Sequence, residues 1–337
     1  MNKILVTGGA GYIGSISTYM LLKKGYEVVV IDNFSTGYEE PLIRFKSMFK
    51  SKFNYYETDL KGPLDFIFKK EKGIDAVLHY AAHCLVNESV ENPQKYFSNN
   101  VCGTQNLLST LLTQNIRNII FSSTCAVYGE AEYIPIDEKH PTNPSNPYGE
   151  SKLMIEKILQ WYGKLKGLNY VILRYFNVCG ASDDGKIGDS KYPSALLVQN
   201  AVRGALGIEP FFLTCPEVNT KDKTPIRDYI NVVDLNEAHI LTLEYILGGG
   251  KSDIFNLGTG TGNSVLEILE KVKKFTGVNF ELKKNQARKG EYAKMVADIK
   301  KAEEVLGWKP KRTIEDSVRT LLTWYKKHPH GWGKNPK

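Results

Sequence analysis

The feature that most constrains the fold is a glycine-rich turn near the N-terminus, placed between two apolar segments. Residues 3–7 read Lys-Ile-Leu-Val-Thr, and glycines follow at Gly8, Gly11 and Gly14. A helical pattern covers 15–24, and a second apolar segment, 27–31, ends at Asp32. A buried strand, a helix and a second strand joined by short links predict a βαβ unit.

The spacing of these glycines indicates a dinucleotide-binding site. The glycines let the backbone turn tightly, approach a diphosphate and pack the helix closely on the strand, while the helix N-terminus faces the phosphates. Asp32 lies 18 residues beyond Gly14, where a carboxylate can bind ribose hydroxyls. Neither Arg nor Lys follows Asp32 before Arg44, so NAD is favoured over NADP.

Strand-like and helical segments alternate along the first half of the chain, with further strands predicted at 53–58, 75–79, 118–122 and 170–175. Such alternation predicts an α/β fold with a doubly wound, mostly parallel Rossmann-type sheet, which binds ligands at the carboxyl ends of its strands. We expect residues 1–178 to form the dinucleotide-binding domain, with segments near 228–260 returning to it. Residues 179–337 are expected to form a smaller α/β domain that binds the substrate.

A candidate acid/base lies where a predicted helix, 148–166, begins. Tyr148 and Lys152 are four residues apart, so they share a face of that helix. An ammonium beside a phenol lowers its pKa, and the hydroxyl of Thr124, at the end of a strand, can share the proton path. Taken alone, the pair is as well explained as the start of an amphipathic helix. Its place at the carboxyl ends of the strands makes it a candidate active site.

Two other strand ends bear on the cofactor. Asp59 follows the third strand, where it can bind an adenine amino group or simply cap the strand. Ala81 and Ala82 follow the fourth, and their small side chains let the chain pass close under a cofactor. His79 lies within an apolar strand and is interpreted as a core histidine.

Composition and charge exclude several classes of protein. The net charge is +7, but the lysines are scattered, which favours a solvated surface over a nucleic-acid groove. The five cysteines include no pair with metal-ligand spacing, and their odd number argues against a disulfide framework, so we expect reduced thiols in the cytoplasm and no metal. Neither a signal peptide nor an apolar run long enough for a membrane span is expected.

Several motifs together resemble those of a known family. They are Gly-Gly-Ala-Gly-Tyr-Ile-Gly-Ser at 8–15, Asp-Asn at 32–33, Ser-Ser-Thr at 122–124, Val-Tyr-Gly at 127–129, Pro-Tyr-Gly-Glu-Ser-Lys at 147–152, Leu-Arg-Tyr-Phe-Asn at 173–177, Arg-Asp-Tyr at 227–229 and Asn-Leu-Gly at 256–258. They resemble the extended short-chain dehydrogenase/reductases and, within them, the UDP-glucose 4-epimerase family of NAD-dependent epimerases and dehydratases. The resemblance extends from Lys3 to about Pro329.

The resemblance implies a tightly bound NAD that is regenerated in each turnover. UDP-glucose and UDP-galactose would be interconverted by oxidation at C4, rotation of the 4-keto sugar and reduction on its other face. Tyr148 would take the proton of the 4-hydroxyl, Lys152 would hold the nicotinamide ribose, and Thr124 would hydrogen-bond the sugar oxygen. A homodimer through the helices at about 95–115 and 150–165 is also implied.

The resemblance further implies which residues bind each ligand. The cofactor set comprises Gly8, Gly11, Tyr12, Ile13, Gly14, Asp32, Asn33, Asp59, Leu60, Tyr80, Ala81, Ala82, Asn99, Ser122, Tyr148, Lys152, Tyr175 and Phe176. The substrate set comprises Thr124, Tyr148, Asn177, Phe212, Arg227, Arg288, Glu291 and Met295. Met295 occupies the position expected to limit the substituent at C2 of the sugar.

Other enzyme activities and one non-catalytic function are alternatives to this interpretation. A 4-epimerase of UDP-N-acetylhexosamines, UDP-pentoses or UDP-uronates fits the same motifs, and 194–197 and 222–224 depart from the family pattern. A 4,6-dehydratase needs acids where Cys125 and Ala126 stand, and a decarboxylase needs a glutamate there. A non-catalytic NAD sensor, the alternative from another class, commonly lacks the tyrosine or lysine that this chain keeps.

Overall fold

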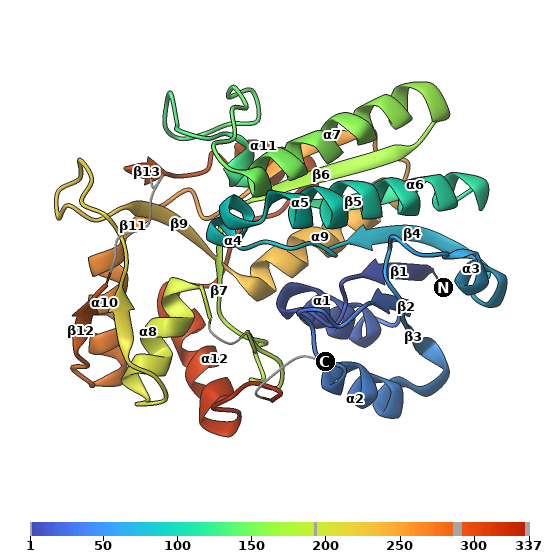
Figure 1. The fold of residues 1–337 in the computed structure, drawn as a ribbon. Helices are drawn as coiled ribbons and strands as arrows, with labels where there is room; N and C mark the ends of the chain where they lie inside the picture. The colour runs from blue at the N-terminus through green and yellow to red at the C-terminus, as the bar shows by residue number, and fades with distance from the viewer. Residues whose placement is uncertain (1, 192–193, 286–291, 334–337) are drawn as a thin grey trace.

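The computed structural model describes residues 2–191, 194–285 and 292–333. At its centre lies a parallel sheet of seven strands in the order β10-β6-β5-β4-β1-β2-β3 (Figure 1). The strands are β1 (Lys3–Thr7), β2 (Glu27–Asp32), β3 (Phe53–Glu57), β4 (Ile74–His79), β5 (Asn118–Thr124), β6 (Asn169–Tyr175) and β10 (Asp253–Leu257). The order 3-2-1-4-5-6 is that of a Rossmann fold, as predicted, and β10 extends the sheet beyond β6.

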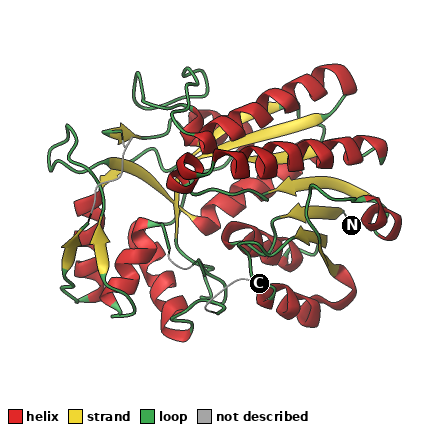
Figure 2. Ribbon diagram, viewed as in Figure 1, coloured by secondary structure: helices red, strands yellow, loops and turns green. Residues whose placement is uncertain are grey.

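Helices cover both faces of this sheet (Figure 2). One face is covered by α1 (Tyr12–Lys23), α2 (Glu40–Phe49), α9 (Val232–Leu247) and α11 (Lys300–Leu306). The other is covered by α3 (Asp65–Lys70), α6 (Gly103–Thr113) and α7 (Pro147–Lys166), with the short α4 (Val86–Glu91) and α5 (Pro93–Tyr96) beside α7. A π-helical turn, Phe97–Cys102, leads into α6.

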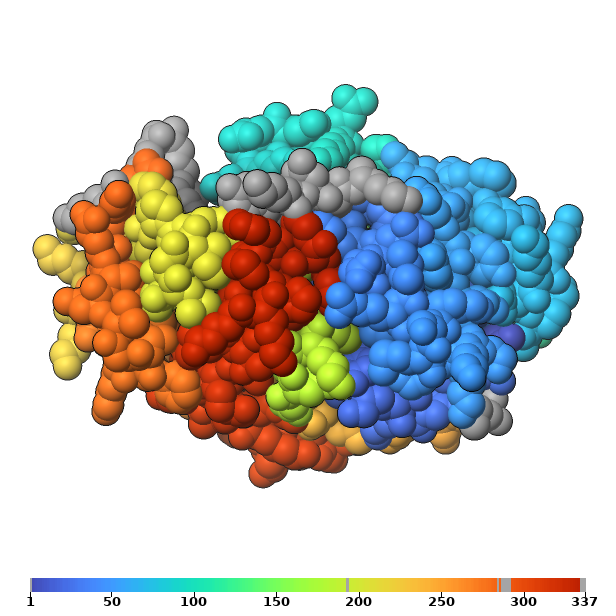
Figure 3. Space-filling model, turned by 90° about the horizontal axis from the view of Figure 1, so that it is seen from below, coloured from blue at the N-terminus to red at the C-terminus, as the bar shows by residue number. Residues whose placement is uncertain are grey.

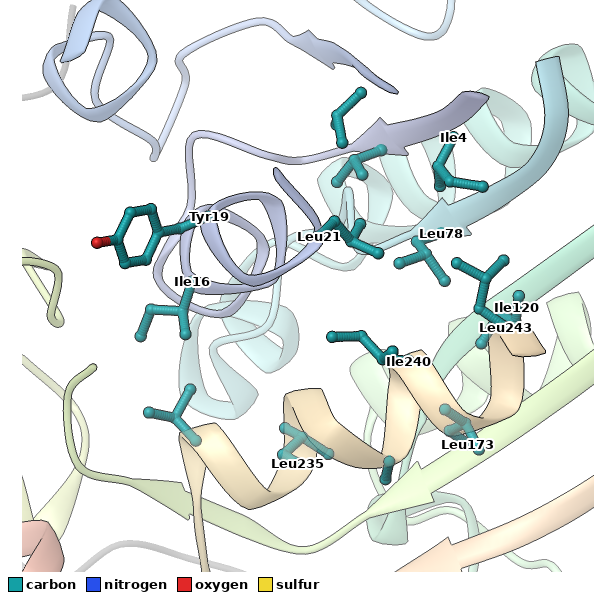
Figure 4. Packing of buried hydrophobic residues seen from close by; sticks show 14 of the residues in the cluster. Ile4, Ile16, Tyr19, Leu21, Leu78, Ile120, Leu173, Leu235, Ile240 and Leu243 are labelled. Carbon is teal, nitrogen blue, oxygen red and sulfur yellow. The ribbon is translucent and has the colours of Figure 1, made fainter. Parts of the chain in front are cut away.

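Apolar side chains of the strands alternate between two buried cores. Figure 4 shows the first, where Ile240 and Leu243 of α9 point toward Leu78 and Ile120 of the sheet. The second core lies on the opposite face, where strands pack against α3, α6 and α7. Burial on both faces explains why the central strands read as continuous apolar runs rather than as alternating ones.

The glycine turn brings α1 against the end of β1 and β4. Gly8 has a φ of +74°, and a Cβ there would lie 2.6 Å from the Ala81 nitrogen. A Cβ on Gly14 would collide with the Gly8 carbonyl oxygen. Both positions therefore require glycine, one for its backbone conformation and close approach, the other for helix–strand packing.

The remaining elements build a second, smaller layer beside the carboxyl ends of the strands. A four-stranded sheet contains β7 (Asn177–Cys179), β9 (Ile226–Asn231), β11 (Gly262–Ser264) and β13 (Lys294–Met295), and a parallel pair contains β8 (Phe211–Leu213) and β12 (Leu282–Lys284). Three helices, α8 (Leu197–Ala205), α10 (Val265–Thr276) and α12 (Ile314–Lys327), share a third core. None of the helices in the described ranges combines the length and apolar character needed to cross a bilayer.

The chain between β7 and α8 joins the two layers. Seen from below, its yellow-green part before residue 192 lies between the red α12 and the blue N-terminal part of the molecule (Figure 3). The Tyr19 hydroxyl lies 3.1 Å from a carboxylate oxygen of Asp184, and the Tyr38 hydroxyl donates to the Ser190 carbonyl over 2.9 Å. These two bonds fix residues 184–190 against α1 and the loop that precedes α2.

Candidate active site

The start of α7 presents Tyr148 and Lys152 to the carboxyl end of the sheet. The Asn146 side chain caps the helix by accepting a hydrogen bond of 2.9 Å from the Gly149 amide. Pro147 follows at the first helical position, where its missing N–H has no intrahelical partner to lose. Because the cap fixes where the helix begins, Tyr148 and Lys152 lie one turn apart on the same side.

Lys152 is buried against β5. Its Nζ donates to the Ser122 carbonyl over 2.8 Å and lies 4.7 Å from the centre of the Phe121 ring. Burial lowers the pKa of Lys152 to about 8. The ammonium is thus held at the end of a strand, in surroundings that magnify its effect on a neighbouring charge.

Tyr148 does not have the lowered pKa that the sequence led us to expect. Hydrogen bonding with Thr124 lowers it, but burial is the larger cause and raises the pKa of Tyr148 well above its usual value. The prediction of a lowered pKa for Tyr148 is therefore wrong for the protein without a bound ligand. Desolvation disfavours the phenolate more strongly than the neighbouring side chains favour it. A positive charge brought beside the hydroxyl would lower this pKa.

Both side chains lie in a cavity of about 280 Å³ at the carboxyl ends of the parallel strands. Most of the residues proposed from the sequence line it. They are Gly8, Gly11, Tyr12, Ile13, Gly14, Asp32, Asn33, Leu60, Tyr80, Ala81, Ala82, Asn99, Thr124, Tyr148, Lys152, Tyr175, Phe176 and Asn177. Side chains from distant parts of the chain thus meet at the edge of the sheet where Rossmann folds bind dinucleotides.

The walls of this cavity fit a dinucleotide. Gly11 precedes α1 without a side-chain cap, so the first amides of this 12-residue helix are left to face a phosphate. Asp32 stands at the end of β2, where its carboxylate accepts hydrogen bonds of 2.9 Å from the amides of Ala10 and Phe34. These bonds orient a buried acceptor for ribose hydroxyls, which is the arrangement that NAD requires.

Two proposed cofactor residues are not among those lining the cavity. Asp59 instead accepts a hydrogen bond of 2.9 Å from the side-chain amide of Asn33, and its other oxygen accepts one from the Lys61 amide. Ser122 is buried, and its carbonyl accepts a hydrogen bond from Lys152. In this arrangement Asp59 orients Asn33, and Ser122 positions the lysine.

A second, smaller cavity of about 120 Å³ adjoins the first. Asn177, Val178 and Leu196 line both cavities, while Arg227 and Phe212 line only the smaller one. The Arg227 guanidinium donates to the Ile226 carbonyl over 2.9 Å. The two cavities therefore lie next to each other, one at the start of α7 and the other in the second layer.

Three proposed substrate residues need separate mention. Met295 is 3 % exposed and packs in a cluster with Tyr128 and Phe176 rather than lining either cavity. Arg288 and Glu291 lie outside the described residues. Within the described ranges, three or more His, Cys, Asp or Glu side chains are nowhere placed to hold a metal ion.

Sequence reasoning missed several residues that line the larger cavity. His83 and Cys84 follow the Tyr-Ala-Ala segment after β4, so their position near a strand end was a usable signal. Thr36 and Thr58 stand in the loops after β2 and β3. Lys191 comes from the polar segment beyond β7, and its local sequence offers no comparable signal.

Comparisons with known proteins are consistent with this geometry. Residues 4–258 match the model of the NAD dependent epimerase/dehydratase family. The chain is 44% identical to a UDP-glucose 4-epimerase of Lactobacillus helveticus, over 98% of this chain and 99% of that protein. It is 43% identical to one of Halalkalibacterium halodurans, over 99% and 98%. The crystal structure of a UDP-glucose 4-epimerase from Bifidobacterium longum with NAD+ and UDP is 36% identical and superposes with a TM-score of 0.93, covering 98% of this chain and 100% of that one.

Proposed function

The chain belongs to the NAD dependent epimerase/dehydratase family, and on this premise we propose that it interconverts UDP-glucose and UDP-galactose as a UDP-glucose 4-epimerase. The observation that carries the proposal is that Thr124, Tyr148 and Lys152 share one cavity with the glycine turn and Asp32. A dinucleotide cradle beside a proton-transferring side chain suits reversible oxidation of a carbon that bears a hydroxyl group.

Tyr148 exchanges the proton in both half-reactions. Its phenolate oxygen takes the proton of the sugar 4-hydroxyl while the hydrogen on C4 departs as hydride. After the sugar presents its other face, the phenol returns the proton to the 4-keto oxygen as C4 regains hydride. NAD, when bound, supplies the acceptor and donor of that hydride and a positive charge that favours the phenolate.

Lys152 and Thr124 support this exchange. We assign to Lys152, held by the Ser122 carbonyl, the hydroxyls of the cofactor ribose and the stabilisation of the Tyr148 phenolate. We assign to Thr124 a hydrogen bond that joins the phenol and the sugar oxygen, in line with its effect on the pKa of Tyr148. Burial raises the pKa of Tyr148. Lys152 and Thr124 would both lower this pKa and so counteract the effect of burial.

We place the nucleotide of the substrate in the smaller cavity. Arg227 offers a planar fork of donors that suits diphosphate and ribose oxygens, and Phe212 offers an aromatic surface, 47% exposed, to the uracil ring. Asn177, which lines both cavities, is assigned to the diphosphate or the sugar. The sugar then lies between the two cavities, beside Tyr148.

We further propose that the enzyme is a homodimer that works in the cytoplasm. Exposed apolar side chains on α7 support the dimer, and the helices at about 95–115 and 150–165 are the proposed interface. The five cysteines are free, which supports a reducing compartment.

The first experiment is to incubate the purified enzyme with UDP-glucose, without added NAD, and to separate the C4 epimers. Tyr148→Phe should lower turnover by about 10²–10⁴-fold, because the variant cannot exchange the proton. Bound NAD, measured after denaturation, should stay at the wild-type level, because the phenyl ring still fills its place. The same assay with UDP-N-acetylglucosamine, a UDP-pentose and a UDP-uronate identifies the preferred sugar.

Tyr162→Phe is the matched control, since Tyr162 lies on the same helix but does not line the cavity. This variant should turn over normally. If Tyr148→Phe forms epimer as fast as the wild type does, the assignment of Tyr148 as the acid/base is wrong.

A further inference from the structure

The larger cavity contains a second lysine that the mechanism does not use. Lys191 lies in the segment between β7 and α8 and is half-buried. It lines the large cavity, and it also lines a small hollow; Gly11 and Tyr12 line both. Lys191 therefore lies near the first turn of α1, whose free amides can face a phosphate.

The contact that Lys191 makes is a weak one for an ammonium. Its Nζ donates to the Cys84 sulfur over 2.9 Å, and a thiol sulfur is a poor acceptor for a group with three donors. The neighbouring Cys84 and, after it, Asp189 raise the pKa of Lys191, so the side chain is charged at neutral pH. A phosphate oxygen would be a stronger partner.

The charged residues that line the cavity show which side chain could neutralise a diphosphate. Of the described residues that line it, those with a formal charge are Asp32, Lys152 and Lys191, because burial lowers the pKa of His83 to about 4 and leaves it neutral. Asp32 stands at the ribose end and Lys152 beside Tyr148. The diphosphate of a dinucleotide carries two negative charges, and the helix terminus offers about half a positive charge. Lys191 is the remaining cation, and it lines a small hollow together with Gly11 and Tyr12 at the start of α1.

The backbone around Lys191 is fixed by long-range hydrogen bonds. The Tyr38 hydroxyl donates to the Ser190 carbonyl over 2.9 Å, and Trp324 Nε1 donates to the Asp189 carbonyl over 3.0 Å. These bonds tie the segment both to the Rossmann layer and to α12. The two residues before Lys191 are thus held in place, and they position its ammonium group at the cavity.

We propose that Lys191 binds the diphosphate of the dinucleotide at the glycine turn, exchanging the Cys84 sulfur for a phosphate oxygen. The residue closes over the cofactor from the second layer and slows its release. This inference rests on NAD as the cofactor of the proposed function, but it concerns retention of the dinucleotide and not the chemistry at C4.

The test measures how fast bound NAD in the purified holoenzyme exchanges with isotopically labelled NAD. Lys191→Gln should exchange about tenfold faster or more, because a charge-assisted hydrogen bond is lost. Its exchange should also respond less to added salt than that of the wild type, because one cation–phosphate contact is missing. Lys191→Arg keeps the charge and should restore slow exchange, which separates loss of charge from damage to the fold.

Two controls isolate the role of the charge. Lys186→Gln removes an exposed lysine of the same segment, paired with Asp184 over 3.4 Å, and should exchange NAD at the wild-type rate. Cys84→Ala removes the present partner of Lys191 and should exchange no faster than the wild type. If Cys84→Ala instead releases NAD as fast as Lys191→Gln, the pair is structural and the proposal fails.

A diphosphate also occurs in the substrate, so a second arm measures the affinity of UDP for the holoenzyme by calorimetry. Lys191→Gln should leave this affinity unchanged, since Lys191 does not line the smaller cavity. Wild-type exchange of NAD in Lys191→Gln, or a loss confined to UDP, would overturn the proposal. Neither readout requires turnover, so failure here and failure of the proposed epimerisation are told apart.

Discussion

At the scale of single residues, burial decides the protonation of His79 at the end of β4. The ring is 1 % exposed, with Nδ1 2.6 Å from the Thr7 hydroxyl and Nε2 2.7 Å from the Thr104 hydroxyl. Burial lowers the pKa of His79 to about 3, and the positive charge of Lys152 acts in the same direction. The interpretation of His79 as a neutral core histidine is confirmed.

Replacing His79 by Gln should therefore remove one source of acid sensitivity. The pKa is about 3 in the folded protein against 6.5 in the unfolded chain, so between these values only the unfolded chain binds the proton. The stability that depends on neutral His79 is complete above about pH 6.5 and is lost as pH falls toward 3. Urea unfolding at pH 7.5 and 4.5 should show the wild type losing about 2–3 kcal/mol more than His79→Gln.

The exposed His330 provides the control for this experiment, since His330→Gln should leave the pH dependence of unfolding as it is in the wild type. An equal loss of stability in the wild type and in His79→Gln would show that His79 is not kept neutral.

The same scale shows which site residues a sequence can reveal. Tyr148 and Lys152 were predictable because helical spacing alone puts them on one side of α7. Cys84 and Lys191 were not, because the two are 107 positions apart and meet only when the second layer is in place. The raised pKa of Tyr148 was missed for a similar reason, since the desolvation that causes it comes from the whole fold.

At the scale of elements, a buried ion pair fixes α7 to the sheet beneath the active site. Glu156, one turn beyond Lys152, accepts hydrogen bonds from Arg174 Nε and Nη2 over 3.0 and 2.5 Å. The Ser123 hydroxyl donates to the same carboxylate over 2.5 Å, and Arg174 Nη1 donates to the Tyr128 hydroxyl over 3.1 Å. This network joins α7 to β5 and β6 and thereby holds Lys152 against the strand end.

Arg174→Met should destabilise the protein by about 3–5 kcal/mol, because it leaves the Glu156 carboxylate buried without its cation. The double variant with Glu156→Met should recover part of that loss, since no buried charge then remains. Urea unfolding of the two single variants and the double variant measures the coupling. Arg319→Met, which removes an exposed pair with Asp316, should cost less than about 1 kcal/mol. A cost for Arg174→Met no larger than that control would refute the structural role.

Elements were predictable where local pattern determines them. The strands of the Rossmann sheet were predicted from their apolar runs, because burial on both faces requires such runs. No strand was predicted at 226–231, yet these residues form β9, the strand to which β7, β11 and β13 are paired. The partners of β9 lie far away in sequence, so its identity as a strand arises from tertiary contacts.

At the scale of the whole molecule, the two layers differ in how far their part of the site can be predicted from the sequence. The Rossmann layer could be anticipated in detail, since strand order and glycine turn fix where a dinucleotide lies. The second layer could not, since its cavity is built from short segments whose relative positions depend on packing. For this reason the proposed substrate residue Met295 proved to be buried, while Phe212 and Arg227 line a cavity.

Assembly is the last property argued at this scale. Met154, Ile158, Trp161 and Leu165 recur at intervals of four, three and four along α7 and so form one stripe, in which Trp161 is 58% exposed. Leu107, Leu111 and Leu153 are buried in the monomer, so the stripe rather than these leucines is available to a second copy.

Trp161→Glu should convert the expected homodimer to monomer in analytical ultracentrifugation, because it puts a charge where apolar area would be buried. Phe275→Glu, a change to an exposed aromatic residue on α10, should leave the dimer intact. A wild-type protein that sediments as a monomer, or a Trp161→Glu variant that remains dimeric, would show that α7 is not the interface.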